Sequence, residues 1–335
     1  MSLEPVLLLG GSGSIGRQAA RALRATYPDV PLLIGGRDLS KAQQAAAELG
    51  EAQGVVIDPA AADLGLGARR ISAVVVLYMD HSLATLRFAQ SRGVPHLSIS
   101  SGVFEIAPEI ASFMHAPSAA PVVLGYEWLV GATTVPALDL AKAFGQVHEI
   151  RIGALVDEED TGGPAVAADF EHLNHLMPAA LTRRDGVYLW REGDDAKAVF
   201  SAVDGTDVEA SGFSSIDVVG LATATGARSV EFNLGSGVSS SRRKGGQLST
   251  EIILELAGLD HAGHALRTRH AVIHPGGAAP LTGMGIALIV ERLVGLDGAP
   301  PVAPGLYFPY QLLDARRYLD RLKKEGGQVL ELAVS

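Results

Sequence analysis

The first hundred residues alternate between short apolar runs and longer stretches in which alanine and polar residues are mixed. Short runs that are apolar throughout are typical of strands buried on both faces of a parallel sheet. We expect such strands at residues 6–9, 31–34, 54–57, 73–77 and 96–99, with helices between them at 14–25, 39–49 and 82–92. Strands that alternate with helices in this way predict an α/β domain whose parallel sheet is covered on both sides.

After about Trp128 polar and apolar residues alternate, which is typical of strands with one solvated face. Strands are expected here at 148–156 and 230–234, and helices at 133–144, 165–176, 217–225, 247–256, 283–296 and 310–325. This pattern predicts a second, α+β domain with a mixed sheet over residues 129–279. Residues 1–128 form the expected first domain, and residues 280–335 are expected to pack back onto it.

Composition narrows the class of protein. The chain has 335 residues, a formal net charge of −10 and a pI ≈ 5.5, which argues against nucleic acid or an anionic membrane as partner. No apolar stretch approaches the ~20 residues of a membrane-spanning helix, and the first residues lack the basic start of a signal peptide. Cysteine is absent, which excludes disulfides and cysteine nucleophiles, and the histidine spacings match no zinc motif. We expect a soluble, cytoplasmic protein without a metal site.

The segment VLLLGGSGSIGRQAARAL, residues 6–23, places a cluster of glycines between a predicted strand and a predicted helix. Gly11, Gly13 and Gly16 fit G-x-G-x-x-G, in which the first glycine takes a tight turn, the second admits a pyrophosphate and the third lets helix and strand pack closely. The helix N-terminus then offers N–H groups to the anion. The motif predicts a Rossmann-type domain that binds a dinucleotide. The expected contacts come from the whole loop: Gly11, Ser12, Gly13, Ser14, Ile15 and Gly16.

The end of the second predicted strand, LLIGGRD, bears on which dinucleotide binds. NAD-binding sites carry an Asp or Glu there for the ribose 2′-hydroxyl. Here Gly35 and Gly36 occupy those positions, and Arg37 follows with a guanidinium that suits a 2′-phosphate. Asp38 is expected to cap the next helix. The cofactor is therefore predicted to be NADP(H) rather than NAD(H).

Further cofactor contacts are expected at the carboxyl ends of the predicted strands, where ligands of open parallel sheets bind. The candidates are Asp58, Leu77 and Ser100. Asp58 is placed to approach the adenine or, equally, to cap the turn before Pro59. Ser100 is placed to bond the carboxamide of the cofactor or the substrate, with a bond to its own turn as the alternative.

These motifs together resemble the saccharopine dehydrogenase-like family of NADP-binding oxidoreductases. The resemblance covers mainly residues 5–145 and also rests on GGRDLSKAQQAAAELG, GVPHLSISSG and GYEWLVGATTVPALDLAKAF. It implies a Rossmann domain, an inserted α/β domain that holds substrate and dimer contacts, a C-terminal return to the first domain, and pyridine-nucleotide chemistry in a homodimer. The second domain lacks a stretch that matches the family's dicarboxylate-binding residues, so the resemblance supports the cofactor more strongly than the substrate.

Tyr78, His81 and Tyr126 are the candidate catalytic residues. Tyr78 and His81 follow the fourth predicted strand and are expected near the nicotinamide, where either type of side chain can pass a proton to a carbonyl or amine as hydride moves. Alternatively, Asp80 caps the next helix and His81 merely begins it. Tyr126 lies at the expected domain junction, where pockets tend to form. No tyrosine has lysine four residues further on, which excludes the Tyr-x-x-x-Lys mechanism of short-chain dehydrogenases.

Glu127, Arg242 and Arg243 are the candidate substrate-binding residues. Glu127 lies at the same junction, and the two arginines form a basic cluster in an acidic chain that suits a carboxylate or phosphate. A charged surface loop explains that cluster equally well.

The favoured hypothesis is an NADPH-dependent oxidoreductase that reduces C=N or C=O in a small polar metabolite resembling an amino acid or keto acid. One alternative is a protein that senses NADP(H) and catalyses nothing, which predicts that the surroundings of Tyr78 and Tyr126 are packed solid. The other is an enoyl reductase for a lipid or polyketide, which predicts an apolar tunnel in the second domain.

Overall fold

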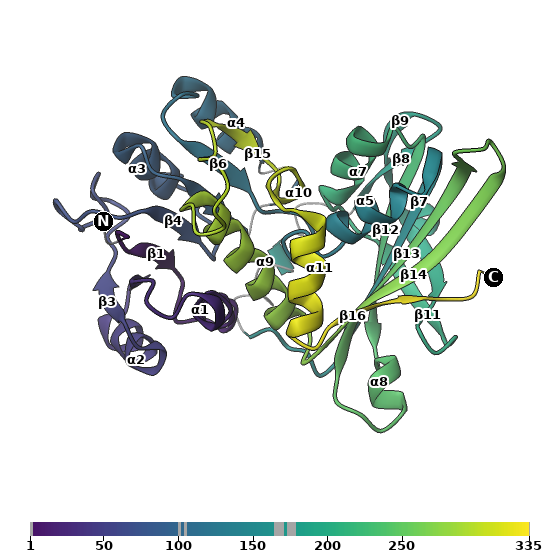
Figure 1. Cartoon of the computed structure of the whole chain (residues 1–335), viewed down its shortest axis with the longest axis horizontal. Helices are drawn as coiled ribbons and strands as arrows, with labels where there is room; N and C mark the ends of the chain where they lie inside the picture. Colours follow the sequence, from purple (N-terminus) through teal and green to yellow (C-terminus); the bar gives the residue numbers. More distant parts are fainter. Residues whose placement is uncertain (1–2, 100–101, 104–105, 164–170, 173–178, 335) are drawn as a thin grey trace. The chain divides into compact units, whose positions relative to one another are not determined.

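The computed structural model describes residues 3–99, 102–103, 106–163, 171–172 and 179–334 (Figure 1). The chain divides into two compact units. Unit 1 comprises Met1–Tyr126 and Thr282–Leu313, and unit 2 comprises Glu127–Leu281 and Asp314–Ser335. Among the described residues, no helix is both long enough and apolar enough to cross a membrane.

Unit 1 is built on a seven-stranded sheet of order β15-β6-β5-β4-β1-β2-β3, and every pairing in it is parallel. Its strands are β1 (Val6–Leu9), β2 (Leu32–Gly36), β3 (Ala52–Val56), β4 (Ala73–Val76), β5 (His96–Ser98), β6 (Pro121–Leu124) and β15 (Gly305–Tyr307). Strands β1 and β4 are buried along their whole length, which is why their sequences are continuous apolar runs. The order of β1 to β6 is that of doubly wound dinucleotide-binding sheets, and it reverses between β1 and β4. The predicted α/β class is confirmed.

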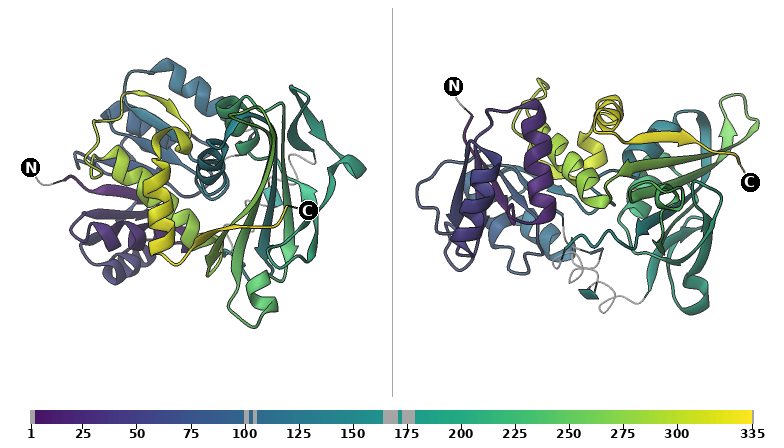
Figure 2. Two further views of the ribbon diagram at one scale, coloured as in Figure 1. Left: turned by 45° about the vertical axis from the view of Figure 1, so that its right-hand side comes forward. Right: turned by 90° about the horizontal axis from the view of Figure 1, so that it is seen from below.

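Six helices are described in or at the boundary of this unit. They are α1 (Ser14–Thr26), α2 (Leu39–Leu49), α3 (Ala84–Arg92), α4 (Ile106–His115), α9 (Ala278–Leu293) and α10 (Pro309–Leu312). Helix α9 runs beside α1 (Figure 2, right). A Cβ at Gly283 of α9 would lie 2.7 Å from the backbone nitrogen of Ala19 in α1. The two helices approach this closely because Gly283 has no side chain.

Unit 2 is built on a mixed sheet of order β10-β11-β12-β7-β13-β14-β16, with β8 paired to β12 and β9 to β8. Its strands are β7 (Phe144–Asp157), β8 (Ala180–Arg184), β9 (Val187–Arg191), β10 (Lys197–Ser201), β11 (Asp207–Gly212), β12 (Ser229–Gly237), β13 (Ser249–Asp260), β14 (Ala265–Pro275) and β16 (Gln328–Glu331). Only β12 and β7 pair in parallel among the described pairings of this sheet. Helices α5 (Thr134–Ala141) and α7 (Asp217–Thr225) pack together, and α7 packs on β12. The predicted mixed sheet is confirmed.

The helix predicted at 247–256 is wrong, because residues 249–256 belong to strand β13. The strand pairs with β7 on one side and β14 on the other. Its segment Ile252–Leu254 is at most 1 % exposed, so it is apolar on both faces and shows no alternation. A short apolar run of this kind has the same pattern in a buried helix and a buried strand. Of the helix predicted at 165–176, the structure describes only residues 171–172.

The end of the chain also differs from the expectation. The helix predicted at 310–325 is divided into α10 and α11 (Ala315–Lys324), and the carboxylate of Asp314 caps α11 by accepting from the amide of Arg317 at 2.8 Å. Residues 314–335 belong to unit 2 rather than unit 1, since α11 packs on α5 and β16 pairs with β14. Tyr318 and Leu322 provide the physical reason, because both are buried on this amphipathic helix.

Candidate functional site

The glycine loop of unit 1 joins β1 to α1. A Cβ at Gly16 would lie 2.5 Å from the Cα of Gly11, so the first turn of α1 rests directly on the loop backbone. A Cβ at Gly13 would meet only the carbonyl of Gly10, at 3.2 Å. Gly13 is the N-cap of α1 and supplies no side-chain acceptor to the first turn, which contains no acidic residue. The first turn of α1 therefore presents N–H groups at an exposed position.

The motif predicted that Gly11 makes the tight turn. In the structure Gly10 makes it instead. Gly10 has φ +82°, which is the left-handed region that favours glycine. Gly11 is required for a different reason, since its Cβ would lie 2.9 Å from the carbonyl oxygen of Leu8. The loop is held by Arg17, whose Nε donates to the carbonyl of Ser12 at 3.0 Å and whose guanidinium pairs with Glu48.

The end of β2 has room where NAD-binding sites carry an acid. A Cβ at Gly35 would lie 2.7 Å from a methyl group of Leu9, so no side chain fits there. At Gly36 nothing lies within 4 Å of the same position, and Arg37 beside it is exposed. Asp38 caps α2 by accepting from the amide of Lys41 at 3.2 Å, as predicted. The open space at Gly36 and the exposed guanidinium of Arg37 suit a phosphate on the cofactor ribose.

Leu77 and Tyr78 follow β4 and border the glycine loop. The Cβ of Leu77 and Cδ1 of Tyr78 lie 3.3 and 3.5 Å from the Cβ position of Gly10. Burial raises the pKa of the half-buried Tyr78 hydroxyl, and Asp80 raises it further, while Arg37 opposes both effects. Tyr78 therefore remains a neutral phenol at neutral pH.

The carboxylate of Asp80 holds the loop before α3 in place through hydrogen bonds. Its carboxylate accepts from the hydroxyl and amide of Ser82, at 2.6 and 3.1 Å, and from those of Thr85, at 2.7 and 2.9 Å. Burial opposes ionisation, but these hydrogen bonds prevail and keep the pKa of Asp80 below its ordinary value. Thr85 also contacts Nε2 of His96 at 3.2 Å, and burial lowers the pKa of that histidine to about 4. Asp80 thus accepts from the amide of Thr85 in the first turn of α3, although Leu83 and not Asp80 occupies the N-cap position, whereas His81 is exposed.

Three oxygen-bearing side chains meet at the carboxyl ends of β5 and β6. The hydroxyls of Ser98 and Tyr126 are 2.7 Å apart. Ser98 lies 3.3 Å from Oε1 of Glu109, and the Tyr126 hydroxyl bonds Oε2 of the same carboxyl group. Ser98 and Glu109 are each 5 % exposed, and Tyr126 is half-buried. We call this group the Ser98–Glu109–Tyr126 ring.

Sequence reasoning found Tyr126 but missed Glu109. The available signal was its position in α4, on the same face as Ile106, Ile110 and Phe113 at helical spacing. A carboxyl group on the apolar face of a helix is unusual and points to a specific partner.

For two of the predicted cofactor contacts, Asp58 and Ser100, the structure gives no contact that supports cofactor binding. Asp58 accepts from the amide of Ala60 at 2.9 Å, so it caps its turn before Pro59, and its approach to adenine stays a prediction. Ser100 lies outside the described residues.

Glu127 begins unit 2 and is buried there. It is 3 % exposed and accepts a hydrogen bond from the Thr134 hydroxyl, so its described contact is structural. The neighbouring Trp128 packs edge-on against Phe213 and Phe232, at 5.4 and 5.6 Å between ring centres, as expected of a core residue.

A buried carboxyl group supports this region of unit 2. Asp217 is fully buried and accepts from the Trp128 amide at 2.7 Å and from the Ser215 hydroxyl. Burial raises the pKa of Asp217 to about 6, although these hydrogen bonds favour its charged form. The folded protein therefore holds a proton that the unfolded chain releases above about pH 4.

This carboxyl group predicts a pH-dependent stability of unit 2. Its contribution is fully present below about pH 4 and is lost as the pH rises through about 6. The loss amounts to about 3 kcal/mol for a shift of about two units. In Asp217→Asn the side chain keeps an acceptor oxygen and cannot ionise. We expect the free energy of unfolding of the wild type, relative to this variant, to fall between pH 4 and 7.

Denaturant titrations followed by the fluorescence of Trp128 and Trp190, which both belong to unit 2, measure this difference. Asp185→Asn, in the exposed turn between β8 and β9, is the matched control and should keep the wild-type slope. Equal pH slopes for the wild type and Asp217→Asn would contradict the prediction.

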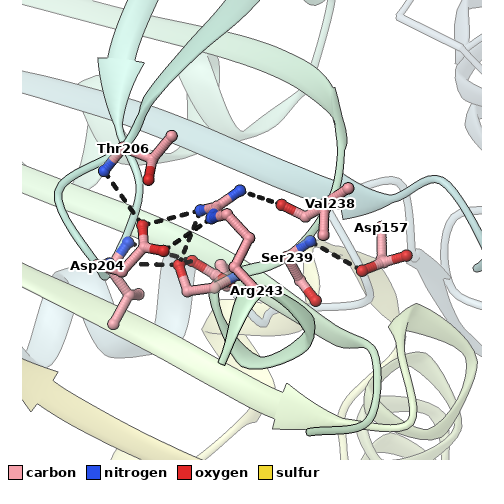
Figure 3. Close-up of polar contacts among 9 residues, drawn as sticks. Asp157, Asp204, Thr206, Val238, Ser239 and Arg243 are labelled. Carbon is pink, nitrogen blue, oxygen red and sulfur yellow. Dashed lines mark hydrogen bonds and ion pairs between the residues drawn. The ribbon is translucent and has the colours of Figure 1, made fainter. Parts of the chain in front are cut away.

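The guanidinium groups of Arg242 and Arg243 are occupied by carboxylates of the chain itself. Arg242 pairs with Asp157 at 3.3 Å, Glu158 at 2.7 Å and also Glu159. Arg243 holds Asp204 through two contacts of 2.7 and 2.8 Å, as Figure 3 shows.

These pairs tie together segments distant in the sequence. The hydrogen bond from Arg243 holds the pKa of Asp204 well below its usual range, and Arg243 also donates to the carbonyl of Val238 (Figure 3). The contacts support the interpretation as a charged surface loop, and a substrate role for the two arginines stays a prediction.

The sheet of unit 2 has a hollow whose walls combine charged side chains with Leu256, Ala257 and Val334. Its lining includes Glu149, Arg151, Glu255, Arg267 and Arg269. Arg269 pairs with Glu255 at 3.0 Å, and Arg151 pairs with Glu149 at 2.8 Å. An apolar tunnel would need apolar walls, so this hollow gives no support to the enoyl-reductase alternative.

Comparison with known proteins shows what this fold resembles. No model of a protein family and no curated protein matches the chain. Among solved structures, apo saccharopine dehydrogenase (L-Glu forming) from Saccharomyces cerevisiae matches with a TM-score of 0.63 and 15% identity, over 98% of this chain and 100% of that one. GenD2 from gentamicin A biosynthesis, in complex with NAD, matches with a TM-score of 0.51 and 14% identity, over 100% and 97% of the two chains. The structural match to saccharopine dehydrogenase is thus confirmed, and the chain has the fold of NAD(P)-dependent oxidoreductases.

Proposed function

We propose, from this shared fold, that the protein is an NADPH-dependent oxidoreductase that reduces C=N or C=O in a small polar metabolite of amino acid or keto acid type. The observation that carries the proposal is the glycine loop, which leaves the N-terminus of α1 without a side-chain cap, together with Arg37 at the end of β2. The loop has no side chain at Gly13 to block a diphosphate, and the end of β2 has open space at Gly36. An acid at that position would repel a 2′-phosphate, and none is present.

Different residues of unit 1 bind the cofactor and transfer the proton. N–H groups at the start of α1 bind the diphosphate, and the Arg37 guanidinium binds the 2′-phosphate. Leu77 and Tyr78 form a wall beside the loop. When bound, NADPH supplies the hydride. Tyr126, at the carboxyl end of β6, donates a proton to the nitrogen or oxygen of the reduced bond.

The two alternatives receive less support. A sensor that catalyses nothing was expected to have Tyr78 and Tyr126 packed solid, but both side chains are half-buried. An enoyl reductase was expected to have an apolar tunnel in unit 2, but charged side chains make up much of the lining of the hollow described there.

The proposal is tested in two steps. Fluorescence titration with NADPH and NADH measures binding, and failure of both to bind would overturn the proposal. A panel of keto acid plus amine pairs, aldehydes and enoyl thioesters, followed by NADPH absorbance, then identifies the reaction. Oxidation of NADPH with a keto acid and amine or with an aldehyde is expected, and turnover of enoyl thioesters alone would favour the enoyl reductase.

We also propose that the protein is a homodimer formed through unit 2. Large apolar side chains are exposed on β9 and β10, with Val187 63%, Trp190 43% and Val199 64% exposed. Exposed apolar side chains of this size mark interaction surfaces when they gather. Light scattering after size exclusion should give twice the 34.8 kDa chain mass.

The variant Val199→Lys should shift the protein to the monomer, because β10 is an edge strand and a charge there opposes association. Val334→Lys, near the end of the chain and 52% exposed, is the control. A wild-type mass of one chain would contradict the dimer.

A further inference from the structure

Two buried side chains continue the hydrogen bonds of Asp80 into the interior of unit 1. Thr85, in the first turn of α3, and His96, at the start of β5, are each at most 2 % exposed. The hydroxyl oxygen of Thr85 lies 2.7 Å from Oδ2 of Asp80 and 3.2 Å from Nε2 of His96. We call these residues the Asp80–Thr85–His96 chain. It joins the loop after β4 to α3 and to β5.

The proton of the Thr85 hydroxyl can serve only one of these two contacts. Burial opposes ionisation of Asp80, but hydrogen bonds from Ser82 and Thr85 keep its pKa below the ordinary value, so it is a carboxylate at neutral pH. A carboxylate only accepts hydrogen bonds, and its short contact with Thr85 therefore takes the hydroxyl proton. The Thr85 oxygen then offers a lone pair to His96, so Nε2 of the imidazole must donate.

The burial of His96 agrees with this order of protons. Its imidazole is neutral at neutral pH, because burial lowers the pKa to about 4 and outweighs the opposing effect of Asp80. A neutral imidazole carries one N–H, and no described residue is a hydrogen-bond partner of Nδ1. A proton on Nδ1 would leave that buried N–H without an acceptor and the 3.2 Å contact without a proton. A proton on Nε2 satisfies every contact of the chain.

The chain ends on a loop that borders the glycine loop. Leu77 and Tyr78 lie beside Gly10, and the Leu77 amide donates to the carbonyl of Leu9 in β1 at 2.9 Å. Tyr78 is thus held on one side by the bond to β1 and on the other by the bonds of Asp80 to α3. The bonds of Asp80 therefore help to determine where the Tyr78 side chain lies.

The same loop contains a strained residue that needs support from its surroundings. Leu83 has φ +53°, in the left-handed region that leucine rarely adopts. Its amide donates to the carbonyl of Asp80 at 3.0 Å. A strained backbone persists only where neighbouring contacts hold it. Without the Thr85 hydroxyl, the Asp80 carboxylate loses one of its four hydrogen bonds, and we expect the loop to relax.

We propose that the Asp80–Thr85–His96 chain holds Tyr78 where it borders the bound nucleotide, with Nε2–H of His96 donating to Thr85 and the Thr85 hydroxyl donating to Asp80. Thr85 and His96 are positioning residues, because they act on the nucleotide through the loop after β4. The contact of Tyr78 with a nucleotide rests on the proposed function. The order of protons is a property of the protein alone.

The first experiment reads the order of protons without nucleotide. Nitrogen NMR of protein labelled at histidine distinguishes a protonated ring nitrogen from a bare one. At pH 7 His96 is expected to carry its proton on Nε2, and a proton on Nδ1 or an equal mixture overturns the proposed order. The signal lost in His96→Gln is that of His96, and assignment through the wild-type backbone identifies it if this variant does not fold. Thr85→Val removes the acceptor and should shift the Nε2 signal.

The second experiment tests the positioning role by nucleotide titration. Thr85→Val keeps the shape of the side chain and the amide that donates to Asp80, but it has no hydroxyl. It should bind NADPH and NADH roughly 3- to 10-fold more weakly than the wild type, the value of one hydrogen bond. Thr85→Ser keeps the hydroxyl and should bind as the wild type does. Ser91→Ala is the matched control on the same helix, since the Ser91 hydroxyl donates to the carbonyl of Phe88 within α3.

The outcomes separate positioning from a merely structural role. Weaker binding by folded Thr85→Val, with recovery in Thr85→Ser, supports the proposal. Wild-type affinity in Thr85→Val overturns the positioning role, and so does an equal loss in Thr85→Ser. If thermal unfolding shows that Thr85→Val is not folded, Asp80→Asn, which keeps one acceptor oxygen, should show the same weakening. Failure of the wild type to bind either nucleotide overturns the proposed function and the positioning role with it, whereas the NMR measurement still decides the order of protons.

Discussion

Replacing Arg37 with alanine is expected to weaken NADPH binding roughly 10- to 100-fold, the value of one or two charge-assisted hydrogen bonds. Affinity for NADH should stay within about twofold, because NADH has no 2′-phosphate for the guanidinium to bind. Fluorescence titration with both nucleotides measures the ratio. Arg87→Ala, at an exposed position on α3, is the matched control and should bind both nucleotides as the wild type does.

Gly36→Asp sharpens this test, because the structure has open space at that position. The carboxylate should repel the 2′-phosphate and accept from the 2′-hydroxyl, so that the variant prefers NADH. Equal loss of both nucleotides in Arg37→Ala, or an unchanged preference in Gly36→Asp, would show that the end of β2 does not select the cofactor.

Gly16→Ala is expected to have the largest effect on unit 1 as a whole. The added Cβ would lie 2.5 Å from Cα of Gly11 and 2.8 Å from the carbonyl oxygen of Gly10, and both are backbone atoms that cannot turn aside. We expect the free energy of unfolding to fall by about 1–3 kcal/mol, the usual cost of overpacking, and nucleotide binding to be lost. Denaturant titration and nucleotide titration measure the two effects.

Gly13→Ala separates binding from folding. Its Cβ meets only one carbonyl, at 3.2 Å, and otherwise enters the space in front of the loop. This variant should be nearly as stable as the wild type. Its affinity for NADPH should nevertheless be lower than that of the wild type, because the methyl group occupies the place of the diphosphate. Gly36→Ala is the control for stability, since nothing lies within 4 Å of its Cβ. Wild-type affinity in Gly13→Ala would exclude the loop as the binding site.

The glycine loop could be predicted from sequence because its determinants are local. β1, the loop and α1 are contiguous over residues 6–26, and the interactions that place them, such as Gly16 on Gly11, join residues a few positions apart. The absence of an acid at the end of β2 is likewise visible in the sequence, which has Gly35 and Gly36 at those positions. Even here the turn was assigned to Gly11 instead of Gly10, because consecutive glycines give the same pattern whichever of them turns.

The tertiary structure was needed wherever a contact joins distant segments. Ser98, Glu109 and Tyr126 come from two strand ends and a helix, and no spacing in the sequence relates them. The carboxylate that Arg243 holds belongs to Asp204, 39 residues away, so the sequence showed a cation but not its partner.

The local sequence pattern also left two questions open: whether residues 247–256 form a helix or a strand, and to which unit residues 314–335 belong. The stretch 247–256 was predicted to be a helix, and pairing with β7 and β14 makes its residues from Ser249 onward a strand. Residues 314–335 join unit 2 because β16 finds an edge at β14. The sequence by itself determined the glycine loop and the class of the first sheet, since backbone conformation and hydrophobic period are properties of neighbouring residues. Which strands pair, which charges meet and which carboxyl group keeps its proton are decided only when folding brings remote residues into one low-dielectric place.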